Sequence, residues 1–179
     1  TNGKLYTSDK WNYSWRNDAV EVALISDNSS FVISGIELKN RSWSNTTGLI
    51  QGVTTITSSN EAKKDFNGFQ NTQSIAEYTH ASAAYECTVT QFKNGQMGYL
   101  ASVGEWMEII NNLDEINRCM SLIDGLDIDE GTTSYWTSTQ YNSEKAWLMT
   151  YNGNEFYPND FNAYFSPNAQ NKTFTYPIY

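Results

Sequence analysis

Two tryptophans in neighbouring β-prone segments constrain the fold more than any other feature of this chain. Trp136 lies in the run Tyr135-Trp136-Thr137-Ser138-Thr139, and Trp147 follows in the run that begins at Ala146. Both runs combine aromatic residues with threonine or aliphatic residues, a composition typical of strands. Because large rings dominate the free energy of burial, we expect both indoles to anchor the core.

The segments before these strands have the signature of helices. Ser102 and Glu105 have the spacing of a capping box, and Trp106 opens an apolar stripe that repeats at i+3, i+4 and i+7. A shorter helix is predicted over 114–123, with Gly125 as its stop. An earlier helix is predicted from about residue 71 to residue 89, because Ile75 and Tyr78 have helical spacing and alanines follow.

The rest of the chain has mostly strand and turn signals. The dipeptide Asn152-Gly153 is the strongest turn signal, and it predicts a hairpin. The predicted loops are 40–48, 58–69 and 158–172. The predicted strands are 20–25, 30–34 with an extension to 38, 49–57, 134–139, 146–151, 155–157 and 173–176.

The order of strands, then helices, then strands indicates an α+β fold rather than a doubly wound sheet. We expect two main helices packed on an antiparallel sheet, with an N-terminal β-hairpin extension. A length of 179 residues suits one domain over 1–179. Its predicted parts are a mostly β part (1–65), a helical part (66–125) and a part of hairpin and binding loops (132–179).

Composition excludes some partners. The formal net charge is −9, and Lys63-Lys64 is the only basic pair, so we expect no nucleic-acid partner. No apolar run approaches the roughly 20 residues that span a bilayer, so we expect no membrane insertion by this segment. The chain opens on Thr1 rather than Met, which leaves open an upstream signal, anchor or domain.

Metal and catalytic signals are weak. Cys87 and Cys119 fit no zinc spacing, and His80 is the single histidine. The two thiols are either buried and free or joined in one disulfide. His80 has no clear partner for nucleophilic catalysis, and no phosphate loop is present. We therefore expect no enzymatic activity.

Calcium is the one cation that the sequence brings into question. Carboxylates gather at Asp124, Asp127, Asp129 and Glu130, and Glu155 precedes a second polar segment at 158–160. Hard cations favour clustered carboxylates, but neither spacing is that of a known calcium loop. A solvated acidic loop is the alternative, and we expect no cofactor.

Four motifs, in this order, resemble the C-type-lectin-like domain of the formylglycine-generating-enzyme type. They are the strand 23–33, the segment 65–72 (DFNGFQNT), the segment 100–106 (LASVGEW) and the segment 135–139 (YWTST). The likeness extends to gut-bacterial and phage surface proteins whose ligand-binding segment is diversified by retroelements. Ala101 replaces the usual proline of the third motif, and 175–179 departs from the usual closing strand.

The resemblance implies a lectin-like scaffold that binds a ligand. Catalytic members of the family need cysteines late in the chain to bind copper, and the last third of this sequence has none. The resemblance therefore implies a binding protein without catalysis, outside the cell, on a bacterial surface or a phage virion.

The candidate ligand-binding surface follows residue 139, where Tyr, Phe and Asn are denser than a hairpin requires. Aromatic rings give contact area and Asn gives adaptable hydrogen bonds. The alternative is that the rings pack under the loop and Asn serves turns. The candidate residues are Tyr141, Asn142, Glu144, Asn152, Asn154, Phe156, Tyr157, Asn159, Asp160, Asn162 and Tyr164.

Two functions follow from these features. The first is a ligand-binding or adhesion domain that contacts a protein or glycan on a cell surface. The second is a structural or assembly component of a fimbria, surface layer or phage tail, for which oligomers are expected.

Overall fold

The computed structural model describes residues 4–19, 21–39, 42–92, 95–128, 134–150, 155–161 and 169–175. Its helices are the short 3-10 helices η1 (Ser8–Lys10) and η2 (Tyr13–Asp18), then α1 (Ser59–Ala62), α2 (Gly68–Tyr78), α3 (Ala83–Val89), α4 (Val103–Asn111) and α5 (Leu113–Leu122). Its strands are β1 (Val22–Ile25), β2 (Ser30–Lys39), β3 (Tyr99–Leu100), β4 (Ser134–Gln140), β5 (Lys145–Thr150), β6 (Glu155–Asp160) and β7 (Ala169–Thr175). The predicted α+β class is confirmed.

One mixed sheet organises these elements. Its strand order is β1-β2-β7-β4-β5-β6, and β3 pairs with β7. The late strand β7 therefore joins the N-terminal hairpin to the C-terminal one. The β4–β7 pair is parallel, which corrects the expectation of a wholly antiparallel sheet, and β1–β2 is part of the sheet rather than an extension. The predicted β5–β6 hairpin is confirmed, with Thr150 opposite Glu155.

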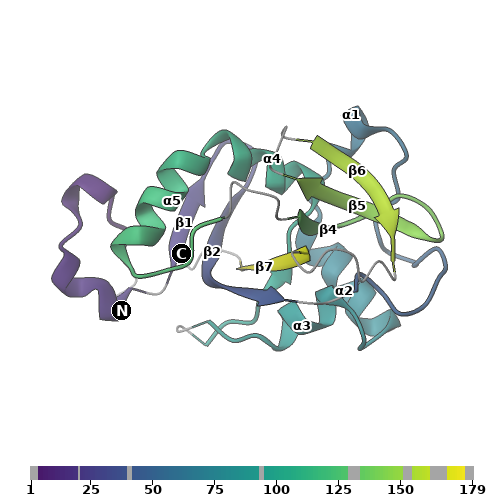
Figure 1. Ribbon diagram of the computed structural model, residues 1–179, viewed down its shortest axis with the longest axis horizontal. Coiled ribbons are helices and arrows are strands. Elements are labelled where there is room, and N and C mark those ends of the chain that lie inside the picture. Colours follow the sequence, from purple (N-terminus) through teal and green to yellow (C-terminus); the bar gives the residue numbers. More distant parts are fainter. Residues whose placement is uncertain are drawn as a thin grey trace.

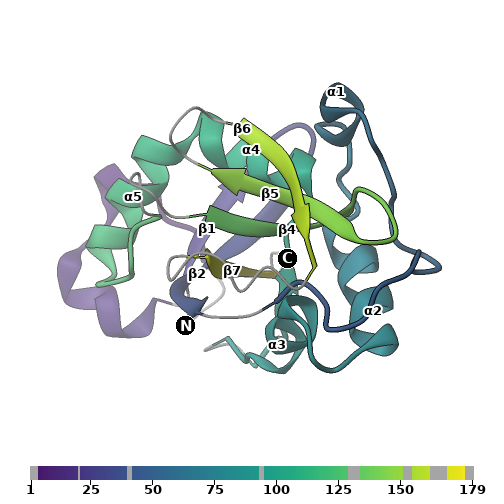
Figure 2. The same cartoon turned by 45° about the vertical axis from the view of Figure 1, so that its right-hand side comes forward.

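Helices cover both faces of the sheet. Figures 1 and 2 show α2 and α3 together at one end and α5 at the other. Trp147 packs into the core beneath α4 and α5, whereas Trp136 packs into the core against α2 and α3. Both indoles are buried, as predicted. They anchor opposite faces because successive side chains of a strand alternate.

Indole N–H groups fasten distant segments to the central strands. Trp43 Nε1 donates to the Thr137 carbonyl at 2.7 Å, and Trp147 Nε1 donates to the Ile56 carbonyl at 2.8 Å. Each buried ring thus satisfies its polar atom, as burial requires. The segment 43–56 is held against β4 and β5 as a result.

A buried polar junction joins three of the four sequence motifs. Asp65 Oδ2 accepts from Thr139 Oγ1 at 2.6 Å and from Asn71 Nδ2 at 3.1 Å, and Asp65 Oδ1 accepts from the Asn67 N–H at 3.0 Å. The Asp65 carbonyl accepts from Ser102 Oγ at 2.6 Å and from the Gly104 N–H at 2.9 Å. The start of α2, the start of α4 and the end of β4 are therefore tied to one residue, Asp65.

Glu105 lies beside this junction. Its Oε2 accepts from the Ser102 N–H at 2.8 Å, the capping contact expected from the sequence, and its Oε1 accepts from Tyr99 Oη at 3.1 Å. Burial raises the pKa of Glu105 to about 7, against the lowering effect of the hydrogen bonds from Ser102 and Tyr99.

The predicted helix over 71–89 is two helices. Thr79 is extended (φ −153°, ψ 132°), and Ser82 Oγ accepts from the Tyr85 N–H at 3.0 Å as the N-cap of α3. Thr79 Oγ1 also accepts from the Ala81 N–H at 3.2 Å. Hydroxyl groups that compete for backbone N–H groups interrupt the helix, despite the alanines around them.

The predicted strand 49–57 is irregular, apart from one bridge between Thr55 and Gln140. Gly52 has a positive φ of 88°, and the Ile50 N–H donates to Gln140 Oε1 instead of to a strand. The predicted loop 58–69 contains α1 and the start of α2, because α2 begins three residues before the predicted start.

Other boundaries also differ from the predictions. Gly125 was predicted to end the helix, but the residue that adopts the left-handed conformation after α5 is Asp124 (φ 56°). β6 continues to Asp160 and β7 starts at Ala169, so 158–172 is only partly a loop. The turn at 152–153 lies outside the described residues. Within the described part of the chain, no helix is long and apolar enough to cross a membrane.

Replacing Gly104 tests the junction. A Cβ on Gly104 would lie 2.4 Å from the Asp65 carbonyl oxygen, which cannot retreat without breaking its hydrogen bonds. We expect Gly104→Ala to lower the free energy of unfolding by about 2–3 kcal/mol in urea titrations. The control Gly95→Ala has a nearest neighbour at 3.9 Å but a positive φ of 84°, so it should cost about 1 kcal/mol. Equal losses would contradict the packing argument.

The pKa of Glu105 predicts a pH dependence of stability. Because the folded protein binds this proton more tightly than the unfolded chain, stability is fully present below about pH 4.5 and falls as the pH rises to about 7. Glu105→Gln removes this titration. We expect its stability relative to the wild type to rise by on the order of 3 kcal/mol across that window. The control is Glu77→Gln, a change at an exposed carboxylate, which should follow the wild type. If the free energies of unfolding of the wild type and Glu105→Gln change with pH in parallel, the assignment is refuted.

Candidate ligand-binding surface

The structure places seven of the eleven predicted site residues. Asn152, Asn154, Asn162 and Tyr164 lie outside the described residues. The others occupy the turn between β4 and β5 or the edge strand β6: Tyr141, Asn142 and Glu144 in the first, and Phe156, Tyr157, Asn159 and Asp160 in the second.

The alternation of β6 divides its four candidates between two faces. Phe156 pairs with Met149 and is buried in the core beneath α4 and α5, so its assignment to the binding surface is wrong. Tyr157 pairs with Leu148, on the face of the other core, and is 39% exposed. Among the late residues whose side chains are described, Tyr157 is therefore the most exposed aromatic ring.

The two described candidate asparagines bond the backbone beside them. Asn142 Oδ1 accepts from the backbone N–H groups of Glu144 and Lys145, each at 2.8 Å. Asn159 Oδ1 accepts from the Asp160 N–H at 2.9 Å. The Asn142 bonds close the β4–β5 turn, which is the alternative that the sequence left open. The Asn159 bond lies within β6.

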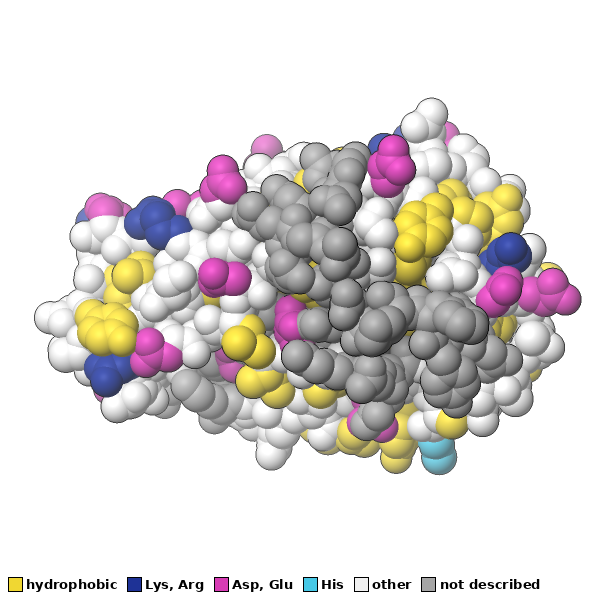
Figure 3. All heavy atoms as spheres, in the orientation of Figure 1, with side chains coloured by type: hydrophobic (Ala, Val, Ile, Leu, Met, Phe, Trp, Pro, Cys, Tyr) yellow, Lys and Arg dark blue, Asp and Glu magenta, His cyan; other side chains and the backbone are white. Residues whose placement is uncertain are grey.

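Four side chains remain at the rim, and we call them the turn–edge surface: Tyr141, Glu144, Tyr157 and Asp160. Tyr141 is half-buried and packs edge-on against Trp147, with ring centroids 5.2 Å apart. Asp160 Oδ1 lies 3.5 Å from Lys145 Nζ, and both side chains are exposed, so this pair adds little stability. Figure 3 shows acidic and hydrophobic side chains side by side near this end of the sheet.

A neighbouring loop that the sequence did not assign to the site supports the turn. The Gly48 N–H donates to the Ser143 carbonyl at 2.6 Å, and Gln140 Nε2 donates to the Gly48 carbonyl at 2.6 Å. Leu49 and Tyr78 are exposed nearby, and Tyr78 Oη donates to the Thr47 carbonyl at 3.0 Å. In the sequence, the glycine at position 48 was the signal that could have indicated this close approach, and it adopts a φ of 146°.

Groups with catalytic or metal-binding chemistry lie apart from this surface. His80 is exposed in the break between α2 and α3 and stacks on Tyr85 at 4.5 Å. Asp124 is bonded to Tyr13 and Arg16, and 129–130 lies outside the described residues. Among the residues that are described, no group of three His, Cys, Asp or Glu is placed to hold a metal ion.

Both cysteines are free thiols, which decides between the two alternatives. Cys87 is buried in the core against α2 and α3. Cys119 is half-buried on α5, and burial raises the pKa of its thiol.

Comparison with known proteins gives a fold relationship. No family model and no curated protein sequence matches this chain. A solved structure, that of a fimbrial protein from Bacteroides ovatus ATCC 8483, is similar with a TM-score of 0.54 and 16% sequence identity. The match covers 81% of this chain and 35% of the other, so this chain spans about a third of that protein. At this identity the likeness extends to the fold.

The role of Asn142 can be tested against its neighbour. Asn142→Ala removes the acceptor of two backbone N–H groups, so we expect a loss of about 1–2 kcal/mol in the free energy of unfolding. The exposed Glu144→Ala should change it by less than about 0.5 kcal/mol. Urea titration of both variants measures the difference. A neutral Asn142→Ala would return Asn142 to the candidate ligand contacts.

Proposed function

We propose that this chain is a non-catalytic binding module of a bacterial surface assembly of the fimbrial kind. It contacts a protein or glycan through the turn–edge surface. The observation that carries the proposal is the contrast between fixed backbone and exposed side chains at this rim. Asn142, Gln140 and Gly48 fix the turn, while Glu144, Tyr157 and Asp160 reach water.

Such an arrangement suits recognition because little conformational entropy is lost when the partner binds. The backbone is already ordered, and Tyr157 brings contact area with only two rotatable side-chain bonds. Glu144 and Asp160 add charge, which sets the choice of partner more than the affinity. A complementary partner surface presents hydrogen-bond donors or cations around an apolar centre.

The scaffold is proposed to be C-type-lectin-like. This interpretation is supported by the way the sequence motifs come together: segments 65–72, 100–106 and 135–139 meet at the Asp65 junction. Because the three segments bond to one another in the folded protein, they form one structural unit, and this accounts for their occurrence in the same chain. Asp65, Asn71, Ser102 and Thr139 of this junction are buried, so they hold the frame and leave recognition to the rim.

The location is proposed to be extracellular, on a bacterial surface. The similar solved structure is named as a fimbrial protein, and this chain matches about a third of it. A module of a larger fimbrial protein is consistent with that share. The same name favours a second function, in which the turn–edge surface contacts another subunit of the fibre rather than a protein or glycan ligand. Light scattering distinguishes the two, since only the second requires self-assembly or a dedicated subunit partner.

The test uses a triple variant, Glu144→Ala, Tyr157→Ala and Asp160→Ala. The probes are an array of glycans and a panel of extracellular matrix proteins, against labelled wild-type protein. For any probe that binds, we expect the triple variant to lose at least about tenfold in affinity.

A control variant removes two exposed carboxylates elsewhere, Asp27→Ala and Asp114→Ala, and should bind as the wild type does. Thermal unfolding checks that both variants fold. Undiminished binding by a folded triple variant would place the contact surface elsewhere.

A further inference from the structure

A cluster of exposed aromatic rings lies in residues 4–19, which we call the N-terminal arm. The ring centroids of Tyr6 and Trp15 are 5.2 Å apart, those of Trp11 and Trp15 are 5.9 Å apart, and those of Tyr6 and Trp11 are 6.1 Å apart. Tyr6 is 43% exposed and Trp15 39%. Neither 3-10 helix of the arm contains a buried residue. Apolar rings gathered at the surface in this way mark an interaction site.

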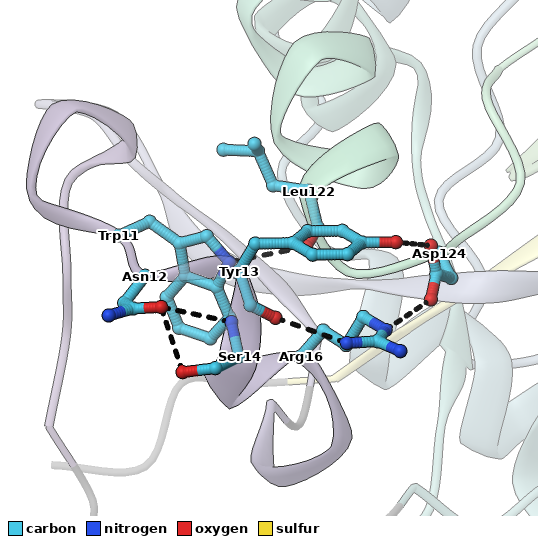
Figure 4. A network of polar contacts seen from close by, with 7 residues as sticks. All are labelled: Trp11, Asn12, Tyr13, Ser14, Arg16, Leu122 and Asp124. Carbon is cyan, nitrogen blue, oxygen red and sulfur yellow. Dashed lines mark hydrogen bonds and ion pairs between the residues drawn. The ribbon is translucent and has the colours of Figure 1, made fainter.

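Polar contacts with α5 and its last turn fix the arm in place (Figure 4). Trp11 Nε1 donates to the Leu122 carbonyl at 3.2 Å, and Tyr13 Oη donates to Asp124 Oδ1 at 2.8 Å. Arg16 Nε donates to Asp124 Oδ2 at 2.9 Å and lies over the Tyr13 ring at 4.5 Å. The cluster is thus held on a folded element before any ligand arrives.

The charges around the cluster compensate one another. Arg16 pairs with Asp124, and Arg118 of α5 pairs with Glu115. The remaining charged residues of the arm comprise two cations and two anions: Lys4, Lys10, Asp9 and Asp18. A polyanion or an anionic lipid surface would find no excess of positive charge here. The cluster therefore fits an uncharged partner.

We propose that the N-terminal arm is a second binding site, which takes neutral β-linked pyranose oligosaccharides. A gluco-configured ring carries its hydroxyls at the edge and exposes apolar C–H faces that pack on aromatic rings. The planes of Trp11 and Trp15 are 88° apart, so the cluster forms a corner rather than a flat strip. Tyr6 packs against both indoles, so the three rings present one aromatic patch to a sugar.

Two exposed asparagines of the arm, Asn12 and Asn17, are available to bond sugar hydroxyls. Asn12 Oδ1 accepts from Ser14, and Figure 4 shows the amide nitrogen of Asn12 directed away from that network. Asn17 is exposed on η2. Rings with adjacent amides are the combination that Tyr- and Asn-rich binding surfaces use.

This site is independent of the turn–edge surface. The arm lies beyond α5 at one end of the molecule, and the β4–β5 turn lies at the other, in both views (Figures 1 and 2). Failure of one site therefore leaves the other untouched.

Tryptophan fluorescence gives a local readout. Of the six tryptophans, Trp43, Trp106, Trp136 and Trp147 are at most 3% exposed, so a ligand-induced change reports Trp11 and Trp15. The probes are cellohexaose and chitohexaose, with heparin and polygalacturonate as anionic comparators. We expect a saturable change with a Kd of about 0.1–1 mM for a neutral hexasaccharide. Trp15→Ala should weaken it at least about tenfold, and Trp15→Tyr should weaken it less.

Calorimetric titration of the same proteins confirms binding without the fluorophore, and thermal unfolding confirms that the Trp15 variants fold. The proposal is overturned if neither neutral hexasaccharide binds at about 5 mM. It is also overturned if an anionic polymer binds more tightly, or if Trp15→Ala binds as the wild type does. A fluorescence change with protein concentration alone would assign the cluster to a second copy of this chain and overturn it as well.

Discussion

The hydrogen bonds of Asp65 are the constraint on which the rest of the structure depends. A carboxylate that is almost wholly removed from water must have its oxygens satisfied, because an unpaired buried carboxylate costs several kcal/mol. Its partners come from residues 67, 71 and 139, and its carbonyl adds 102 and 104. Separating α2 or the end of β4 removes partners of the carboxylate, and separating α4 removes the partners of the carbonyl. The two cores lie on either side of the sheet that these bonds hold in place.

Local signals in the sequence predicted the elements that local contacts decide. Ser102 and Glu105 predicted the start of α4, and the strands around Trp136 and Trp147 were found because strand composition is distinctive. Long-range contacts decided what was missed. The bridge of Thr55 to Gln140 depends on backbone groups far apart in the sequence, and β7 pairs with strands that no local pattern connects to it. The break at Thr79 was missed because alanine propensity outweighed two hydroxyls in the prediction.

The candidate site shows the same limit at the scale of single residues. Density of Tyr, Phe and Asn directed the prediction to the strands after residue 139, but it carries no information about faces. One position along β6 separates buried Phe156 from exposed Tyr157, so the strand register decides which ring meets water. Asn142 was assigned to recognition because its residue type suits both roles, and only the hydrogen bonds of the turn separate them. The N-terminal arm was overlooked because it has neither strand nor helix periodicity.

The two proposed contact surfaces are attached to the frame by different physics, and this difference has a functional consequence. The turn–edge surface is part of the sheet, so its geometry persists as long as the sheet does. The arm is attached through exposed contacts, with the Arg16–Asp124 pair among them, and salt screens such pairs. We therefore expect its docking on α5 to have a smaller free energy than global unfolding, so that the arm detaches locally before the fold is lost. A surface of this kind can release its ligand when conditions change while the turn–edge surface remains engaged.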